Sequence, residues 1–147
     1  MKSLVIVLVL AVFAVPLTAQ GVKDSLDKAM QEKRQAEKSA LVLRELAQTN
    51  YRAMMDIPAN DGLFVEDGKL LVATYRVALK SGVAIKAGDV TKITQVKLLD
   101  FGVQIYFGET GSAIIGWADK FEPANQPVEV VAALAKKTVL AMFEPVR

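Results

Sequence analysis

The pattern of apolar and polar positions changes period several times along the 147-residue chain. An unbroken apolar run covers residues 4–15, a helical pattern covers 22–55, short strand-like runs follow between 63 and 117, and a helical pattern returns at 128. These changes predict an α+β fold. We expect a long N-terminal helix, a small antiparallel β-barrel of five or six strands, and a C-terminal amphipathic helix.

The first helical pattern is rich in strong helix formers, and its first proline is Pro58. Val22, Leu26 and Met30 form only a thin apolar stripe in its first half, whereas the half beginning near Leu41 is more apolar. We therefore expect residues 20–57 to form a helical arm whose second half packs on a domain of residues 58–147. The first half is a candidate coiled-coil or docking arm, and a solvated spacer is the alternative.

Short runs separated by turn residues predict the strands. Asp67-Gly68 between two apolar runs predicts a hairpin. Alternation over residues 71–80 predicts a strand whose odd-numbered positions are buried, and similar alternation places Trp117 in the core. Gly102 and Gly116 inside strand patterns indicate bulges or bends.

The C-terminal pattern predicts a helix that closes one end of the barrel. Pro127 falls in its first turn, Lys136 and Lys137 lie opposite the apolar face, and Pro145 ends it. The apolar face and its neighbours comprise Val128, Val130, Val131, Leu134, Ala135, Thr138, Val139 and Met142.

The N-terminus has the pattern of a secretory signal peptide over residues 1–19. Lys2 precedes the apolar run, and Pro16 and Ala19 precede a cleavage site. A run of 12 residues is shorter than the roughly 20 that a membrane span needs. We expect a periplasmic or secreted protein without a stable membrane span after cleavage, with an uncleaved anchor helix as the alternative.

Composition then limits the chemistry. The sequence has no Cys and no His, which excludes serine–histidine and cysteine–histidine nucleophiles, thiolate or imidazole zinc sites and CxxC redox pairs. The formal net charge of +2 includes Lys2, so the mature chain carries about +1. This balance argues against nucleic-acid binding. We expect no enzyme activity and no cofactor.

Acidic residues offer two further candidates. Asp56, Asn60 and Asp61, with Glu66 and Asp67 nearby, supply oxygen ligands, but their spacing does not match an EF-hand, and a turn rich in Asx residues is the favoured interpretation. Three carboxylate pairs fall at predicted turns, where acids are ordinary, and catalysis by them is disfavoured. The pairs are Glu66/Asp67, Asp100/Glu109 and Asp119/Glu122.

The aromatic residues of the strand region suggest a binding face. Tyr106 and Gln104 alternate with inward-pointing residues, so we expect them to point outward, with Arg76 nearby. Exposed aromatics on a small barrel suit stacking against a glycan, a peptide or a single strand, although core or edge packing is more common.

Gly88-Asp89 lies between two apolar runs and is expected to be a barrel corner. A strand rather than a helix follows it, which excludes a phosphate cradle. The segment Lys86-x-Gly88-Asp89 followed by Val96, together with the terminal helix, resembles a class of small exported bacterial proteins without assigned function. That resemblance implies a small envelope-side barrel and implies no activity or site.

The function expected from these features is that of an exported, non-enzymatic binding or assembly module of the bacterial cell envelope. Its partner would be another envelope protein, or a second copy paired through the N-terminal helix. A small-ligand or glycan-binding β-barrel is the alternative.

Overall fold

The computed structural model describes residues 19–109 and 112–147. The predicted signal peptide lies outside the described residues, except that Ala19 begins the first helix. The chain divides into two compact units, residues 1–34 and 35–147. The first unit contributes only the N-terminal part of helix α2 to the described structure.

The described fold is α+β, as predicted, with a long N-terminal helix. The helices are α2 (Ala19–Leu46), α3 (Val72–Leu79), α4 (Val128–Leu140) and the 3-10 helix η1 (Pro123–Asn125). The strands are β1 (Asn50–Ala53), β2 (Ile57–Pro58), β3 (Gly62–Glu66), β4 (Lys69–Leu70), β5 (Val83–Ile85), β6 (Val90–Thr91), β7 (Ile93–Leu98), β8 (Gly102–Phe107), β9 (Ser112–Trp117) and β10 (Phe143–Val146).

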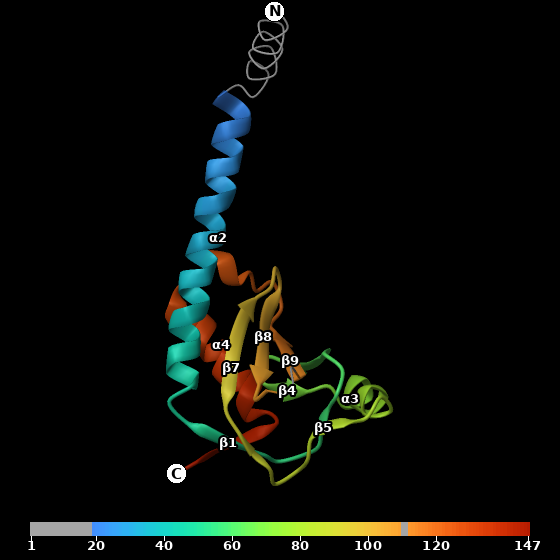
Figure 1. The fold of residues 1–147 in the computed structure, drawn as a ribbon. Coiled ribbons are helices and arrows are strands. Elements are labelled where there is room, and N and C mark those ends of the chain that lie inside the picture. The colour runs from blue at the N-terminus through green and yellow to red at the C-terminus, as the bar shows by residue number, and fades with distance from the viewer. Residues whose placement is uncertain (1–18, 110–111) are drawn as a thin grey trace, which may run out of the picture. The chain divides into compact units, whose positions relative to one another are not determined.

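The strands form open sheets, so a closed barrel is not confirmed. The largest sheet has the order β4-β3-β9-β8-β7, and smaller sheets have the orders β10-β1-β6 and β2-β5. Strands β3 and β9 pair in parallel, whereas the other pairings are antiparallel. Figure 1 shows the strands of the largest sheet side by side. The alternative of a ligand-binding β-barrel therefore has no closed barrel in the described structure to enclose the ligand.

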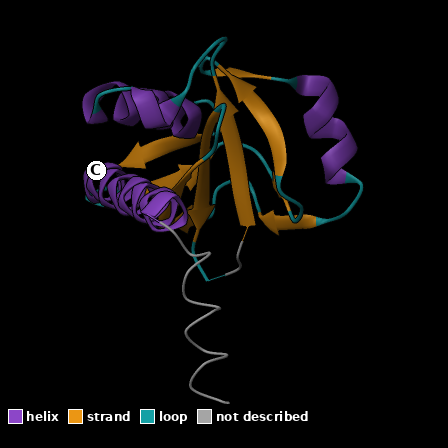
Figure 2. Ribbon diagram, turned by 90° about the horizontal axis from the view of Figure 1, so that it is seen from above, coloured by secondary structure: helices purple, strands orange, loops and turns teal. Residues whose placement is uncertain are grey.

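Helices cover both sides of the strands. Figure 2 shows α3 on one side and α4 on the other. On the α4 side, β8 contributes Val103, Ile105 and Phe107, which are fully buried as predicted. Phe107 stacks on Phe143 with ring centroids 4.3 Å apart. On the other side, Phe64 meets Tyr75 of α3 edge to face.

The predicted helix through residue 55 is wrong, because α2 ends at Leu46 and a strand follows. In β1, Tyr51 and Ala53 are buried while Asn50 and Arg52 are exposed, which is the two-residue period of a strand. Both edges of β1 pair, with β10 and with β6, and this tertiary pairing overrides the local helix propensity.

The predicted strand over residues 71–80 is also wrong. Residues 72–79 form α3, which contains no buried residue, and Val77 is 65% exposed. The hairpin before it is confirmed: Asp67 and Gly68 have positive φ angles of 44° and 80° between β3 and β4. Strand pairing in this hairpin ends at Leu70. The alternating apolar and polar residues that follow belong to the exposed helix α3.

The two strand glycines mark close packing, and a bulge lies beside Gly116, because β3 shifts register against β9 between Leu63 and Val65. The register of β8 against β9 runs without a shift from Gly102–Trp117 to Phe107–Ser112. A Cβ atom on Gly116 would lie 2.7 Å from the Cβ of Thr138, so only glycine lets α4 approach β9 this closely. Trp117 is half-buried and outside the core, contrary to the prediction.

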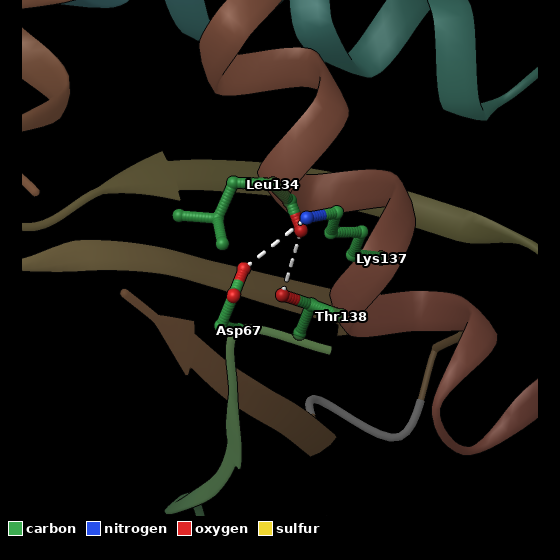
Figure 3. A network of polar contacts seen from close by, with 4 residues as sticks. All are labelled: Asp67, Leu134, Lys137 and Thr138. Carbon is green, nitrogen blue, oxygen red and sulfur yellow. Dashed lines mark hydrogen bonds and ion pairs between the residues drawn. The ribbon is translucent and has the colours of Figure 1, made fainter. Parts of the chain in front are cut away.

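Helix α4 confirms the predicted C-terminal helix, but it packs on the sheet instead of closing a barrel. Its buried residues include Val131, Leu134 and Thr138, and Lys136 and Lys137 are exposed. Figure 3 shows Lys137 Nζ paired with Asp67 Oδ1 at 3.2 Å and Thr138 Oγ1 donating to the Leu134 carbonyl at 2.8 Å. The helix ends at Leu140, before Pro145, because the chain turns into β10.

Candidate interaction surface

The residues predicted as a binding face are not brought together as expected. Gln104 and Tyr106 lie on the side of β8 opposite Val103 and Ile105, but Gln104 is only 8% exposed. Its Nε2 donates to Asp61 Oδ2 at 2.9 Å. The prediction missed the burial of Gln104, because the alternation of apolar and polar residues shows to which side of a strand a side chain points. It does not show which other residues cover that side.

Tyr106 is half-buried, and Arg76 is exposed on α3. Helix α3 packs against β2 and β3, and β3 is separated from β8 by β9 in the sheet order. Arg76 therefore does not share a strand face with the other two residues. The predicted grouping depended on a strand at residues 71–80 that does not form.

Two of the candidate metal ligands, Asp56 and Asp61, form hydrogen bonds within the chain. Asp56 Oδ1 accepts the Ala87 N–H at 2.9 Å, and the Asp56 carbonyl accepts the Tyr75 hydroxyl at 2.8 Å. Burial, and then the charge of Asp56, raise the pKa of Tyr75. Asp61 binds Gln104, as described above. In the described part of the chain, no group of three or more Asp or Glu side chains is arranged to hold a metal ion.

Gly88-Asp89 is a structural corner, as predicted. Gly88 has a φ angle of 94°, and its N–H donates to the Ala53 carbonyl at 2.8 Å. The Asp89 N–H donates to the Lys86 carbonyl, and the Ala53 N–H donates to the Asp89 carbonyl at 2.9 Å. These bonds join the corner to β1.

The first half of α2 presents an exposed apolar stripe. Every residue from 19 to 34 is exposed. Val22, Leu26 and Met30 recur every four residues, and each is more than half exposed, at 51%, 58% and 53%. The rest of the segment is polar or small and carries Lys28 and Glu32 as an i,i+4 ion pair at 4.0 Å. We name Val22, Leu26 and Met30 the apolar stripe.

Opposite charges lie beside the apolar stripe. With 3.6 residues per turn, Lys23 and Asp27 fall together on one flank of it, next to Met30 and Leu26. Gln31 lies on the far side of the helix. Between Val22 and Met30, this flank of the apolar stripe therefore carries one positive and one negative side chain, Lys23 and Asp27.

The described part of residues 35–147 has hollows on its surface, among them a first and a second hollow. The first, of about 410 Å³, lies between the end of α2, β1, α4 and β10, and its lining includes Glu45, Tyr51, Lys136 and Leu140. Burial raises the pKa of Tyr51. The second, of about 310 Å³, lies where β3 and β9 end and β8 begins. Its lining comprises Glu66, Asp100, Phe101, Trp117, Ala118, Asp119, Lys120, Phe121 and Glu122.

The second hollow gathers acids that sequence reasoning had paired only by proximity along the chain. Asp119 and Glu122, one of the candidate pairs, both line this hollow, and Glu66 and Asp100 line it without their paired residues Asp67 and Glu109. The parallel pairing of β3 with β9 brings Glu66 beside Trp117. Parallel pairing needs a long connection, which here contains α3, and the prediction of a strand at residues 71–80 hid it.

No family model, curated protein or solved structure matches this chain. Among the described residues, no helix is both long and apolar enough to cross a membrane. The predicted resemblance to small exported bacterial proteins stays a prediction.

Proposed function

We propose that this protein is an exported, non-enzymatic assembly module of the bacterial cell envelope, and that two copies pair through residues 19–34. The observation that carries the proposal is the apolar stripe, three large apolar side chains that are each about half exposed on an otherwise polar helix. Such a stripe is stabilised when another apolar surface removes it from water.

A second copy of the chain fits this stripe in an antiparallel pair. With Leu26 on the two-fold axis, Val22 of each copy faces Met30 of the other, so a small side chain meets a long one. Lys23 then lies nearly opposite Asp27 of the second copy on the same flank. The same surface serves both copies, and the flanking charges attract each other.

Energetics predict a weak pair. Fully burying a Leu, Val or Met side chain stabilises by about 1.5–3 kcal/mol, so six half-exposed side chains contribute about 5–9 kcal/mol. Association costs about 4–15 kcal/mol in lost freedom. The two contributions nearly cancel, so we expect a dimer that forms at high local concentration, as at a membrane surface or within a larger assembly.

The other parts of the proposal rest on the sequence. Export rests on the signal-peptide pattern of residues 1–19, and the non-enzymatic role rests on the lack of Cys and His. Mass spectrometry of the chain recovered from a periplasmic fraction tests export, and we expect a mature N-terminus at Gln20. Recovery of the full chain beginning at Met1 in the cytoplasm would contradict export.

Sedimentation equilibrium of residues 20–147 tests the pairing. We expect a concentration-dependent dimer that Leu26→Asp abolishes, because a carboxylate on the two-fold axis would face its own copy. Gln31→Asp, on the far side of the helix, adds the same charge and should leave the dimer intact. A strict monomer up to about 1 mM, or an unchanged dimer with Leu26→Asp, would contradict the proposal.

A further inference from the structure

The second hollow carries a charge opposite to that of the whole chain. Its lining has four acidic side chains, Glu66, Asp100, Asp119 and Glu122, and one basic one, Lys120, a net charge of −3, whereas the chain has a net charge of +2. Ion pairs in the described part of the chain do not include Glu66, Asp100 or Asp119. The hollow therefore concentrates negative charge that the chain itself leaves uncompensated.

Aromatic rings line the same hollow. Phe101 is 46% exposed, and Trp117 and Phe121 are half-buried. Together these rings give the negatively charged hollow an aromatic surface that a ligand can contact. A ring face attracts a cation, and the carboxylates of the same lining attract a cation as well.

Contacts within the chain hold the rim of the hollow in place. Asn125 Nδ2 donates to Glu122 Oε2 at 2.6 Å. Lys38 Nζ donates to the carbonyls of Pro123, Ala124 and Gln126 at 2.9, 2.9 and 2.8 Å, which ties this loop to α2. The Phe121 N–H donates to the Ala118 carbonyl and closes a tight turn around Lys120. Glu122 and the backbone of the loop beside it are thus held in place before any ligand binds.

We propose that this hollow binds an arginine side chain from a basic segment of a partner protein. A guanidinium group is planar and stacks on aromatic rings, and its forked N–H donors match carboxylates. Both features are available here, rings from Phe101, Trp117 and Phe121 and carboxylates from the rim. The proposal does not depend on pairing through the apolar stripe, because the hollow belongs wholly to residues 35–147.

Trp117 is the only tryptophan in the sequence, so its fluorescence reports on the hollow directly. We would titrate residues 20–147 with the peptide acetyl-Gly-Arg-Gly-Arg-Gly-amide. Matched peptides carry citrulline, which has nearly the same shape without charge, or lysine, which has charge without the planar fork. We expect a saturable change with the arginine peptide that weakens with added salt.

Removing rim charge tests the assignment further. The double variant Asp100→Asn/Asp119→Asn should weaken binding by about fivefold or more, since two attractive charges are lost. Glu37→Gln/Glu109→Gln removes the same charge outside the hollow and should leave binding unchanged. Leu26→Asp should also bind normally, which separates this test from the dimer test.

Clear outcomes would overturn the proposal. They are no saturable change with the arginine peptide, equal binding of the citrulline peptide, or equal binding of the lysine peptide. A fivefold loss in the control variant as well would also contradict it. Because Asp100 and Asp119 are exposed, folding of the variants is expected, and circular dichroism checks it.

Discussion

At the scale of single residues, Tyr51 shows how burial becomes a pH effect. It is only 5% exposed, and burial raises its pKa. A buried phenol stays protonated in the folded protein at a pH where the unfolded chain begins to lose that proton. The contribution of the protonated phenol to the free energy of unfolding is complete below the ordinary tyrosine pKa of about 10. It is lost as the pH rises through the higher pKa of the folded protein.

We therefore expect the free energy of unfolding to fall above about pH 10, and to fall less steeply in Tyr51→Phe, which has no proton to lose. Urea unfolding of both proteins between pH 8 and 11 measures this difference. Comparing the two slopes removes the shared titration of the lysines. Parallel slopes would contradict the assignment of this effect to Tyr51.

Single residues also show where sequence reasoning succeeds. Asp67-Gly68 and Gly88 were correctly predicted as turns, because positive φ angles restrict residue choice strongly. The burial of Gln104 was not predictable, because Asp61 reaches it from 43 positions away along the chain. Local pattern contains no information about such a distant partner.

At the scale of elements, Lys38 joins α2 to η1 and the start of α4. Its ammonium group donates hydrogen bonds to three backbone carbonyls of the loop that contains η1. Lys38→Met keeps much of the side-chain length but removes the donor. We expect a loss of about 1.5–3 kcal/mol in the free energy of unfolding, the usual range for hydrogen bonds to a charged group.

Chemical denaturation measures that loss, with Lys33→Met as the matched control at an exposed position of the same helix. The control should change stability by less than about 0.5 kcal/mol. Equal stability of the two variants would show that the carbonyl contacts add nothing. A stability loss confined to Lys38→Met would support the account.

The elements also explain the errors of prediction. Tertiary pairing decided the outcome for residues 50–53, whereas residues 72–79 follow the last paired residue of β4 and form a helix without buried residues. Tyr51 became part of a strand because β10 and β6 pair with β1 on its two edges, and β10 comes from the far end of the chain. Helix α4 was predicted as an element because its apolar face recurs with the helical period, although what that face packs against was not predicted.

At the scale of the whole molecule, the proposed interactions rest on two surfaces, the apolar stripe and the second hollow. The stripe was visible in the sequence as spacing every four residues on a polar helix. The hollow was not, because it depends on the parallel pairing of β3 with β9.

The pairing through residues 19–34 is tested most directly by disulfide cross-linking, since the chain has no cysteine of its own. In an antiparallel pair, Leu26→Cys places two thiols together on the two-fold axis, whereas Val22→Cys places each thiol opposite Met30 of the other copy. We predict that mild oxidation cross-links Leu26→Cys and the double variant Val22→Cys/Met30→Cys, but not Val22→Cys alone. Absence of cross-linking in Leu26→Cys, or equal cross-linking in Val22→Cys, would contradict the antiparallel pair.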